Sequence, residues 1–279
     1  MSLPFAKAEA CGNDFLLVAL EHCVGRDLAA LSRALCDRHR GPGADGVEFY
    51  AWSGGRLRLE LFNADGSPAE ISGNGTRCAA AWMASRHGFR EGSIRTGGGE
   101  RWTTVLGEEA GAWQVESRMG APDWRAEAVP LRGAAALGPG RWRLPLPAGE
   151  VECFALSLGN PQCCLQVNEF APDWAALAKR IQDSGCFPQG VNVEFWRRLQ
   201  AQAIEIRIFE RGVGETLSSG TGSTAAAVAA IAAGVVRSPV RVVSPGGEQT
   251  VAWEGGSQEA RLRGWARIVA EGVYLGTLP

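Results

Sequence analysis

Two stretches of the chain, FNADGSPAEISGNGTRCAAA at residues 62–81 and FERGVGETLSSGTGSTAAAV at residues 209–228, align without a gap at an offset of 209 − 62 = 147. Three further pairs of blocks match at this offset or within one residue of it: Gly12-Asn13 with Gly159-Asn160, Asp27–Leu31 with Asp173–Leu177, and Val47–Phe49 with Val193–Phe195. Four collinear blocks indicate an internal repeat. The sequence therefore predicts two homologous halves.

The boundary between the halves is expected near residues 120–147, where several Gly and Pro residues occur. We expect an N-terminal lobe at 1–118, completed by the last strand at about 268–279, and a C-terminal lobe at 119–267 that repeats the first. Two similar lobes usually pack about a pseudo-twofold axis. A ligand on such an axis would receive matching groups from both lobes.

Each half has the same expected order of elements. Alternating apolar residues predict a strand at 56–62 and another at 204–209, with a further short strand at 240–243. Amphipathic helices are expected at 28–38 and 174–182, capped by Asp27 and Asp173. Two more helices, at 76–85 and 223–233, are apolar on nearly every face and are therefore expected to be buried. The predicted class is α+β, with each lobe a twisted, mostly antiparallel sheet wrapped around a central buried helix.

Ser72-Gly-Asn-Gly75 and Ser219-Gly-Thr-Gly222 each lead into one of the buried helices. Free backbone N–H groups at a helix N-terminus, with the helix dipole behind them, form an anion site, and glycines let a ligand approach the backbone. Two such sites that face each other could hold one carboxylate and stabilise the adjacent carbanion. The two serines would then flank the α-carbon from opposite sides, which suits a two-base inversion.

Composition excludes several other classes of function. The 279 residues carry 28 basic and 30 acidic side chains without a basic cluster, so we expect no nucleic-acid or membrane partner. The three histidines and eight cysteines show no metal-ligand spacing, so no metal is expected and the thiols are expected to be reduced and mostly buried. No secretory signal is recognisable, and a cytoplasmic location is expected. A small-molecule partner fits best.

The motifs resemble those of the diaminopimelate epimerase family. The blocks that carry the resemblance span nearly the whole chain: Gly12–Phe15, Phe62–Gly66, Gly73–Cys78, Gly159–Pro161, Val191–Asn192, Glu210–Thr216 and Gly220–Gly222. The resemblance implies a cofactor-independent homodimeric isomerase with two pseudosymmetric lobes. Its implied reaction is the interconversion of LL- and meso-diaminopimelate in lysine and cell-wall biosynthesis.

The resemblance also implies roles for individual residues. The distal end of the amino acid substrate would be recognised by Asn63, Asn160, Asn192 and Arg211. Arg211 would supply a bidentate carboxylate contact. The reacting end would be held by Glu210, at the ammonium group, and by Asn13, Gly73, Asn74, Gly220 and Thr221, at the carboxylate.

The chain departs from the family at the two catalytic positions. The family's cysteines fall on Ser72 and Ser219, while Gln162 and Gly46 stand where the family commonly has His and Gln. A thiol titrates near ~8.5 and a hydroxyl resembles water at roughly 15.7. The difference makes the serine base about 10 kcal/mol costlier to form. We therefore expect impaired turnover.

Two explanations of the serines stay open: deliberate Cys-to-Ser exchange, or a natural branch with lost or changed chemistry. Two alternative functions also stay open. One is a related isomerase or dehydratase that uses Glu210 or Asp65 as a single base. The other is a catalytically silent amino-acid-binding homologue.

Overall fold

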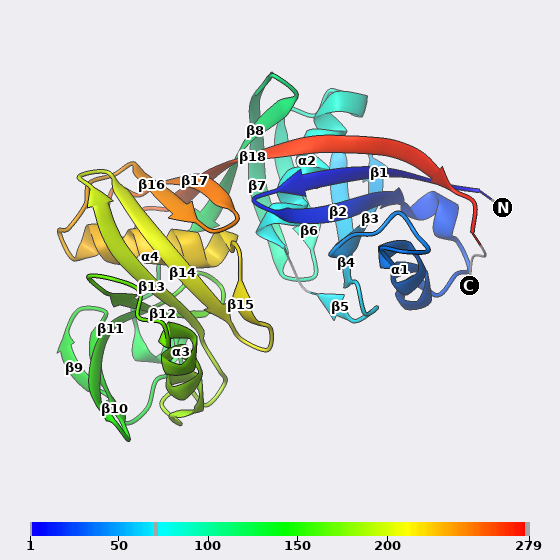
Figure 1. Ribbon diagram of the computed structural model, residues 1–279. Coiled ribbons are helices and arrows are strands. Elements are labelled where there is room, and N and C mark those ends of the chain that lie inside the picture. The colour runs from blue at the N-terminus through cyan, green and yellow to red at the C-terminus, as the bar shows by residue number, and fades with distance from the viewer. Residues whose placement is uncertain (1, 70–71, 277–279) are drawn as a thin grey trace. The chain divides into compact units, whose positions relative to one another are not determined.

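The computed structural model describes residues 2–69 and 72–276 and divides the chain into two compact units. Unit 1 comprises the described residues of 1–117 and 263–279, and unit 2 comprises residues 118–262 (Figure 1). Each unit is a twisted sheet with two α-helices packed against it. The α+β class predicted from the sequence is confirmed.

Unit 1 is built mainly from the first part of the chain. Its strands are β1 (Leu3–Ala10), β2 (Asn13–Ala19), β3 (Gly46–Ser53), β4 (Arg56–Asn63), β5 (Pro68–Ala69), β6 (Glu91–Thr96) and β7 (Gly99–Glu109). Its helices are α1 (Leu28–Cys36), α2 (Gly73–His87) and the 3₁₀ turn η1 (Leu20–Cys23). Two long strands, β8 (Ala112–Gly120) and β18 (Ala260–Tyr274), contribute residues to both units. The end of the expected last strand, at 277–279, lies outside the described residues.

Unit 2 contains the rest of the elements. Its strands are β9 (Ala135–Gly138), β10 (Arg141–Leu146), β11 (Gly149–Ser157), β12 (Pro161–Gln166), β13 (Asn192–Gln200), β14 (Ala203–Glu210), β15 (Gly214–Thr216), β16 (Val240–Ser244) and β17 (Gly247–Ala252). Its helices are α3 (Trp174–Asp183), α4 (Gly220–Ala232) and the 3₁₀ turn η2 (Ala126–Ala128).

The two units share one topology. In unit 1 the order β1, β2, β3, β4, β6, β7 pairs antiparallel, parallel, antiparallel, parallel and antiparallel. In unit 2 the order β11, β12, β13, β14, β16, β17 repeats the same five pairings. A short strand, β5 or β15, adds to the strand that precedes the buried helix in each unit. The sequence repeat therefore corresponds to a repeat of strand order and direction.

Strand alternation gives each sheet two apolar faces. On β2, Phe15 and Leu17 pack in the cluster around α2, whereas Leu16 and Val18 pack in the cluster with α1. In unit 2, α4 is surrounded in the same way by apolar residues of β14, β16 and β17. The side chains of α2 and α4 are buried along most of their lengths, as their all-round apolar sequences predict.

Local signals at the helix starts differ from the expectation in two respects. Helices α2 and α4 each begin three residues before their expected starts, at Gly73 and Gly220. Asp27 caps α1 by accepting from the N–H groups of Ala29 and Ala30, as expected. Asp173 stands at the N-cap position of α3, as expected, but its backbone is not extended and its side chain makes no cap hydrogen bond.

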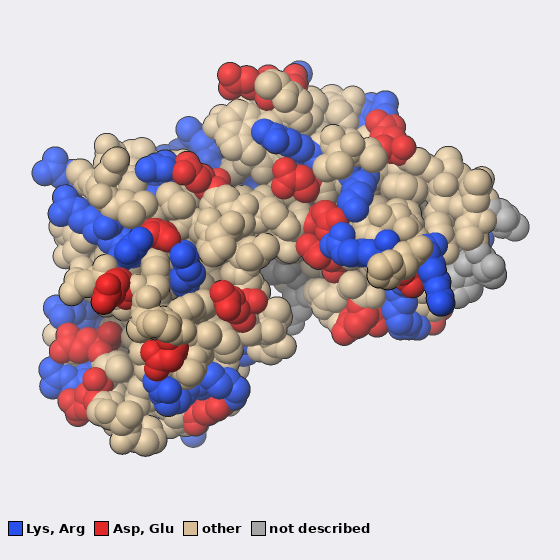
Figure 2. All heavy atoms as spheres, viewed as in Figure 1, with Lys and Arg blue, Asp and Glu red and all other residues tan. Residues whose placement is uncertain are grey.

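Side chains of both signs are interspersed on the face shown in Figure 2. All eight cysteines are free thiols, and seven of them are buried, which confirms the expectation of reduced, mostly buried cysteines. Among the described residues, no helix is long and apolar enough to cross a membrane. No group of three or more His, Cys, Asp or Glu side chains in that part of the chain could hold a metal ion.

Candidate active site

Ser72 is the N-cap residue of α2. Its hydroxyl accepts a hydrogen bond from the backbone N–H of Gly75 at 3.0 Å, and its carbonyl accepts from Thr76. Gly73 and Asn74 form the start of the helix. The remaining N–H groups of this first turn lack intrahelical acceptors by the geometry of any α-helix. The turn therefore provides donors and a positive dipole end for an anion.

Two of the predicted binding residues of unit 1 are hydrogen-bonded to each other. Asn74 donates from Nδ2 to Oδ1 of Asn13 at 2.7 Å, and Asn13 donates from Nδ2 to Asp45 at 3.1 Å. The side-chain Oδ1 of Asn74 accepts a hydrogen bond from the buried guanidinium of Arg77. This chain of contacts fixes the orientation of both amides beside the start of α2. Asp45 and Arg77 also belong to this cluster, and neither was identified from the sequence as a candidate site residue.

Ser219 occupies the same position in unit 2, as the N-cap of α4. Its hydroxyl accepts from the N–H of Gly222 at 3.4 Å and lies 3.5 Å from Oγ1 of Thr221. Burial raises the pKa of the Glu210 carboxyl above its usual value, and a hydrogen bond with the Ser219 side chain opposes that rise. Ser219 and Glu210 thus form a hydroxyl–carboxyl pair. Such a pair can pass a proton between its members.

Three of the residues predicted to bind the distal end of a substrate form local hydrogen bonds in unit 2. The side-chain Oδ1 of Asn192 accepts from the backbone N–H of Arg211 at 2.9 Å. The Arg211 side chain donates from Nη1 to the backbone carbonyl of Gln189 at 2.6 Å. Asn160 accepts from Nε2 of Gln162 at 2.6 Å. The structure therefore brings Asn192 and Arg211 together, next to Glu210 at the end of β14.

Asn63 lies in a surface turn of unit 1 with different partners. Its side chain donates to the hydroxyl of Ser67 at 2.9 Å, and the same hydroxyl donates to Asp65. Hydrogen bonds from Ser67 hold the pKa of the Asp65 carboxyl below its usual range. A carboxylate with a lowered pKa is a weak base, so this geometry favours Glu210 over Asp65 as a single base.

Two buried glutamates were not identified as candidates from the sequence. Glu48 on β3 and Glu194 on β13 are 1% and 0% exposed. A methyl group on Gly75 would overlap Oε1 of Glu48, and one on Gly222 would lie 3.1 Å from Oε1 of Glu194. The second glycine of each loop therefore makes room for a carboxyl inside the unit. Glu48 and Glu194 occupy equivalent positions of the sequence repeat, each as the acidic residue in an apolar strand. That match was the sequence signal that could have identified them.

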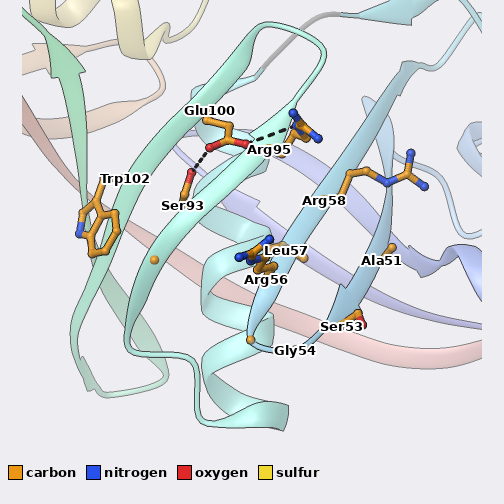
Figure 3. Close-up of a pocket in the computed structure, with 12 residues that line it drawn as sticks. Ala51, Ser53, Gly54, Arg56, Leu57, Arg58, Ser93, Arg95, Glu100 and Trp102 are labelled. Atoms are coloured by element: carbon orange, nitrogen blue, oxygen red, sulfur yellow. Dashed lines mark hydrogen bonds and ion pairs between the residues drawn. The ribbon is translucent and has the colours of Figure 1, made fainter.

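A separate groove of about 950 Å³ in unit 1 holds none of the predicted site residues (Figure 3). It lies over β4, β6 and β7, and Arg56, Arg58, Arg95 and Trp102 are among the residues that line it. Arg95 is ion-paired with Glu100, and Arg58 with Glu60 outside the lining. The groove is thus a charged outer face of the sheet, distinct from the helix starts.

The fold is shared with solved proteins of low sequence identity. A hydroxyproline epimerase from Agrobacterium vitis has a TM-score of 0.64 at 14% identity, covering 98% of this chain and 91% of that one. A phenazine biosynthesis protein from Bacillus anthracis has a TM-score of 0.66 at 14% identity, with 99% and 100% covered. These likenesses define the fold class.

Sequence comparison then gives the family. The diaminopimelate epimerase family model matches residues 5–125 and 154–269, and the chain belongs to that family. The diaminopimelate epimerase of Cupriavidus taiwanensis is 36% identical over 294 residues, covering 100% of both chains. That of Xylella fastidiosa (strain M23) is 35% identical over 286 residues, covering 98% of this chain and 97% of the relative. Membership of this family supports the assignment of the protein as an epimerase, which is a class of isomerase.

Proposed function

We propose that this protein is a cofactor-independent amino acid epimerase whose substrate is diaminopimelate. The observation that carries the proposal is the duplicated helix start, with Ser72 capping α2 and Ser219 capping α4. Each turn supplies backbone donors for an anion, and each serine stands where the family's catalytic cysteine falls. The choice of diaminopimelate as substrate is supported by the two relatives described above, both of which are diaminopimelate epimerases.

In the proposed reaction, one serine removes the α-proton while the other delivers a proton to the opposite face. The electron pair of the broken C–H bond enters the adjacent carboxylate, which the N–H groups of the helix starts stabilise. Inversion follows when the new C–H bond forms from the second serine. This mechanism requires both serines at the same α-carbon, and it needs no electron carrier.

The serines limit the rate of this reaction. A hydroxyl must lose its proton to act as a base, and it holds that proton about seven pH units more tightly than a thiol. Glu210 is the proton acceptor available to Ser219, whereas Asn63 stands at the repeat-equivalent position of unit 1. We propose that the serines at both positions slow proton transfer and so impair turnover, and that substrate binding is retained.

The remaining residue roles belong to the same proposal. Arg211 and Asn192, with Asn63 and Asn160, bind the distal amino acid end, while Asn13 and Asn74 orient the reacting carboxylate. The active form is proposed to be a homodimer, as the family resemblance implies. Sedimentation velocity measures the oligomeric state. The protein acts in lysine biosynthesis in the cytoplasm, without nucleic-acid or membrane partners.

The test is deuterium exchange into LL-diaminopimelate in D₂O, comparing the protein with a Ser72→Cys, Ser219→Cys double variant. We expect α-deuterium and meso product with the double variant and little of either with the parent. No exchange in the variant, with the fold intact by circular dichroism, overturns the epimerase proposal. Binding of diaminopimelate without exchange in either protein identifies the silent binding homologue.

A second candidate, a single-base isomerase or dehydratase, is favoured by one observation: Glu210 is a half-buried carboxyl with a raised pKa beside a hydroxyl. It predicts exchange that disappears in Glu210→Gln and does not depend on Ser72. The two-base reaction predicts that inversion requires both positions 72 and 219.

A further inference from the structure

The interior of each unit contains one carboxyl group directly beneath the start of its buried helix. Along β3, Val47 and Phe49 pack in the cluster with α1, so Glu48 between them points toward α2. Along β13, Val193 and Phe195 pack in the cluster with α3, and Glu194 has the corresponding place beneath α4. Neither glutamate has a role in the proposed proton transfers.

These carboxyls lack the partners that buried charges normally have. Oε2 of Glu48 and Oε1 of Glu194 are buried and accept no hydrogen bond. No Lys or Arg side chain in the described part of the chain forms an ion pair with either glutamate. Ionisation in such surroundings is costly, so these groups are held neutral until the pH rises well above the usual range for glutamate.

The neighbours of Glu48 from each packed element are apolar or weakly ionisable. In the strand registers, Glu48 stands between Leu17 on β2 and Leu61 on β4. From α2, Cys78 is near enough for the charge of Glu48 to raise the pKa of its thiol. Burial raises the pKa of Glu48 to about 8. Its protonation is therefore set by the surrounding apolar core.

The surroundings of Glu194 include one more acid. Its register neighbours are Cys164 on β12, whose thiol donates to Oε2 at 3.4 Å, and Ile208 on β14. Burial raises the pKa of Glu194 well above its usual value, and the nearby charge of Glu210 raises it further. The charge of Glu194 in turn raises the pKa of the Cys163 thiol.

Contact with glycine places both carboxyls at the anion-binding turns. Gly75 and Gly222 belong to the first turns of α2 and α4, and their N–H groups are the ones capped by Ser72 and Ser219. Each glutamate oxygen lies against the Cα side of its glycine. A negative charge at that place acts on the same backbone donors that would bind a substrate carboxylate.

We propose that Glu48 and Glu194 are positioning residues that control, by their own charge, whether the first turns of α2 and α4 can hold an anion. In the neutral form they leave the positive ends of the helices available to the substrate's carboxylate. In the ionised form they oppose it. The inference rests on the proposed function for the identity of that carboxylate, but the electrostatic coupling is a property of this chain alone.

The direct test places a thiol at the helix start as a reporter of local charge. The rate of iodoacetamide alkylation at position 72 is measured by peptide mass spectrometry from pH 6 to 10 in Ser72→Cys. The same measurement is made with Glu48→Gln added, and with Glu60→Gln added as a control that removes an acid ion-paired with Arg58. Ser219→Cys with Glu194→Gln is the matched experiment in unit 2.

We expect Glu48→Gln to lower the pH midpoint of alkylation by about half a unit or more, since a charge a few ångströms away disfavours a thiolate by that amount even in a solvent-like dielectric. Glu60→Gln should leave the midpoint unchanged. Equal midpoints in the Glu48→Gln and parent thiol variants overturn the proposal. Glu48→Met, of similar length, replaces Glu48→Gln if that variant fails to fold.

Calorimetric binding of diaminopimelate at pH 6.5 and pH 9 separates this inference from the proposed function. We expect a several-fold larger loss of affinity between these pH values in the unsubstituted protein than in Glu48→Gln. The same loss in both proteins contradicts the inference. Absence of binding at both pH values contradicts the proposed substrate instead, and the alkylation midpoints still decide whether Glu48 controls the helix start.

Discussion

The side-chain amide of Asn74 donates to the side-chain Oδ1 of Asn13 at 2.7 Å, although the two residues are 61 positions apart in the chain. Asn74 is 3% exposed and also accepts from Arg77. Replacing it with Ala leaves a buried guanidinium without that acceptor, so we expect Asn74→Ala to lower the free energy of unfolding by about 1–3 kcal/mol. Urea denaturation measures the loss.

Asn63→Ala serves as the control for this substitution, because Asn63 is exposed and its side chain donates to Ser67, a neighbour within the same turn. Its expected cost is within about 0.5 kcal/mol. Similar losses for the two variants would show that the contact between Asn13 and Asn74 does not organise the start of α2.

Gly75 cannot accept a side chain without displacing Glu48. We expect Gly75→Ala to destabilise the protein by about 1–3 kcal/mol, as overpacking does elsewhere. Gly222→Ala should cost less, because its methyl group would lie 3.1 Å from Glu194. In a double-mutant cycle, Glu48→Ala should relieve part of the Gly75→Ala loss. Additive losses contradict the contact.

The pH dependence of the free energy of unfolding should reveal the titration of the Glu48 carboxyl. Burial raises its folded-state pKa from 4.5 to about 8. Between these values the unfolded chain has lost the proton and the folded chain keeps it, so the free energy of unfolding falls as pH rises, by up to about 1.4 kcal/mol per unit. The stabilisation is complete below pH 4.5 and is lost as pH rises through 8.

The measurement compares urea unfolding of the protein and Glu48→Gln at several pH values from 4.5 to 9. The variant should lose stability less steeply across that interval, since Gln does not titrate. Parallel curves would mean that Glu48 is ionised in the folded protein. The difference between the two curves is used because the other titrating groups contribute to both.

Arg211 should act on binding rather than on folding. Its guanidinium is exposed and donates to the Gln189 carbonyl, which leaves the planar fork positioned at the end of β14. Arg211→Lys keeps the charge and loses the bidentate geometry. We expect diaminopimelate affinity to fall at least about tenfold, a 1.4 kcal/mol effect, with unchanged thermal stability. Unaltered affinity removes Arg211 from the proposed site.

Periodicity and repeat matching were sufficient to predict much of the fold. The strands at 56–62 and 204–209 are present as β4 and β14, because alternation reports a half-buried strand. The starts of α2 and α4 were placed three residues late, since Gly-rich segments have low helix propensity and the serine caps outweigh it here. Asp173 stands at the N-cap of α3, as its sequence position predicts, but its backbone is not extended and its side chain makes no cap bond.

The candidate site was only partly readable from the sequence. The serines and Asn74 could be placed from the sequence, because residues that lead into a buried helix are confined to its N-terminus, whereas Asn13, at the start of β2, was named only through the family resemblance. Glu48 could not be assigned, because a charged residue in an apolar strand is normally solvent-facing, and only tertiary packing shows which face of β3 it occupies.

Two single variants separate the roles of positions 72 and 219 in proton transfer from opposite faces of the α-carbon. Ser72→Cys and Ser219→Cys are incubated separately in D₂O with LL- and with meso-diaminopimelate, and α-deuterium is located by mass spectrometry and chiral separation. We expect complementary behaviour: each variant exchanges the α-hydrogen of one epimer. Exchange of the same epimer by both variants, with both folded, would contradict it.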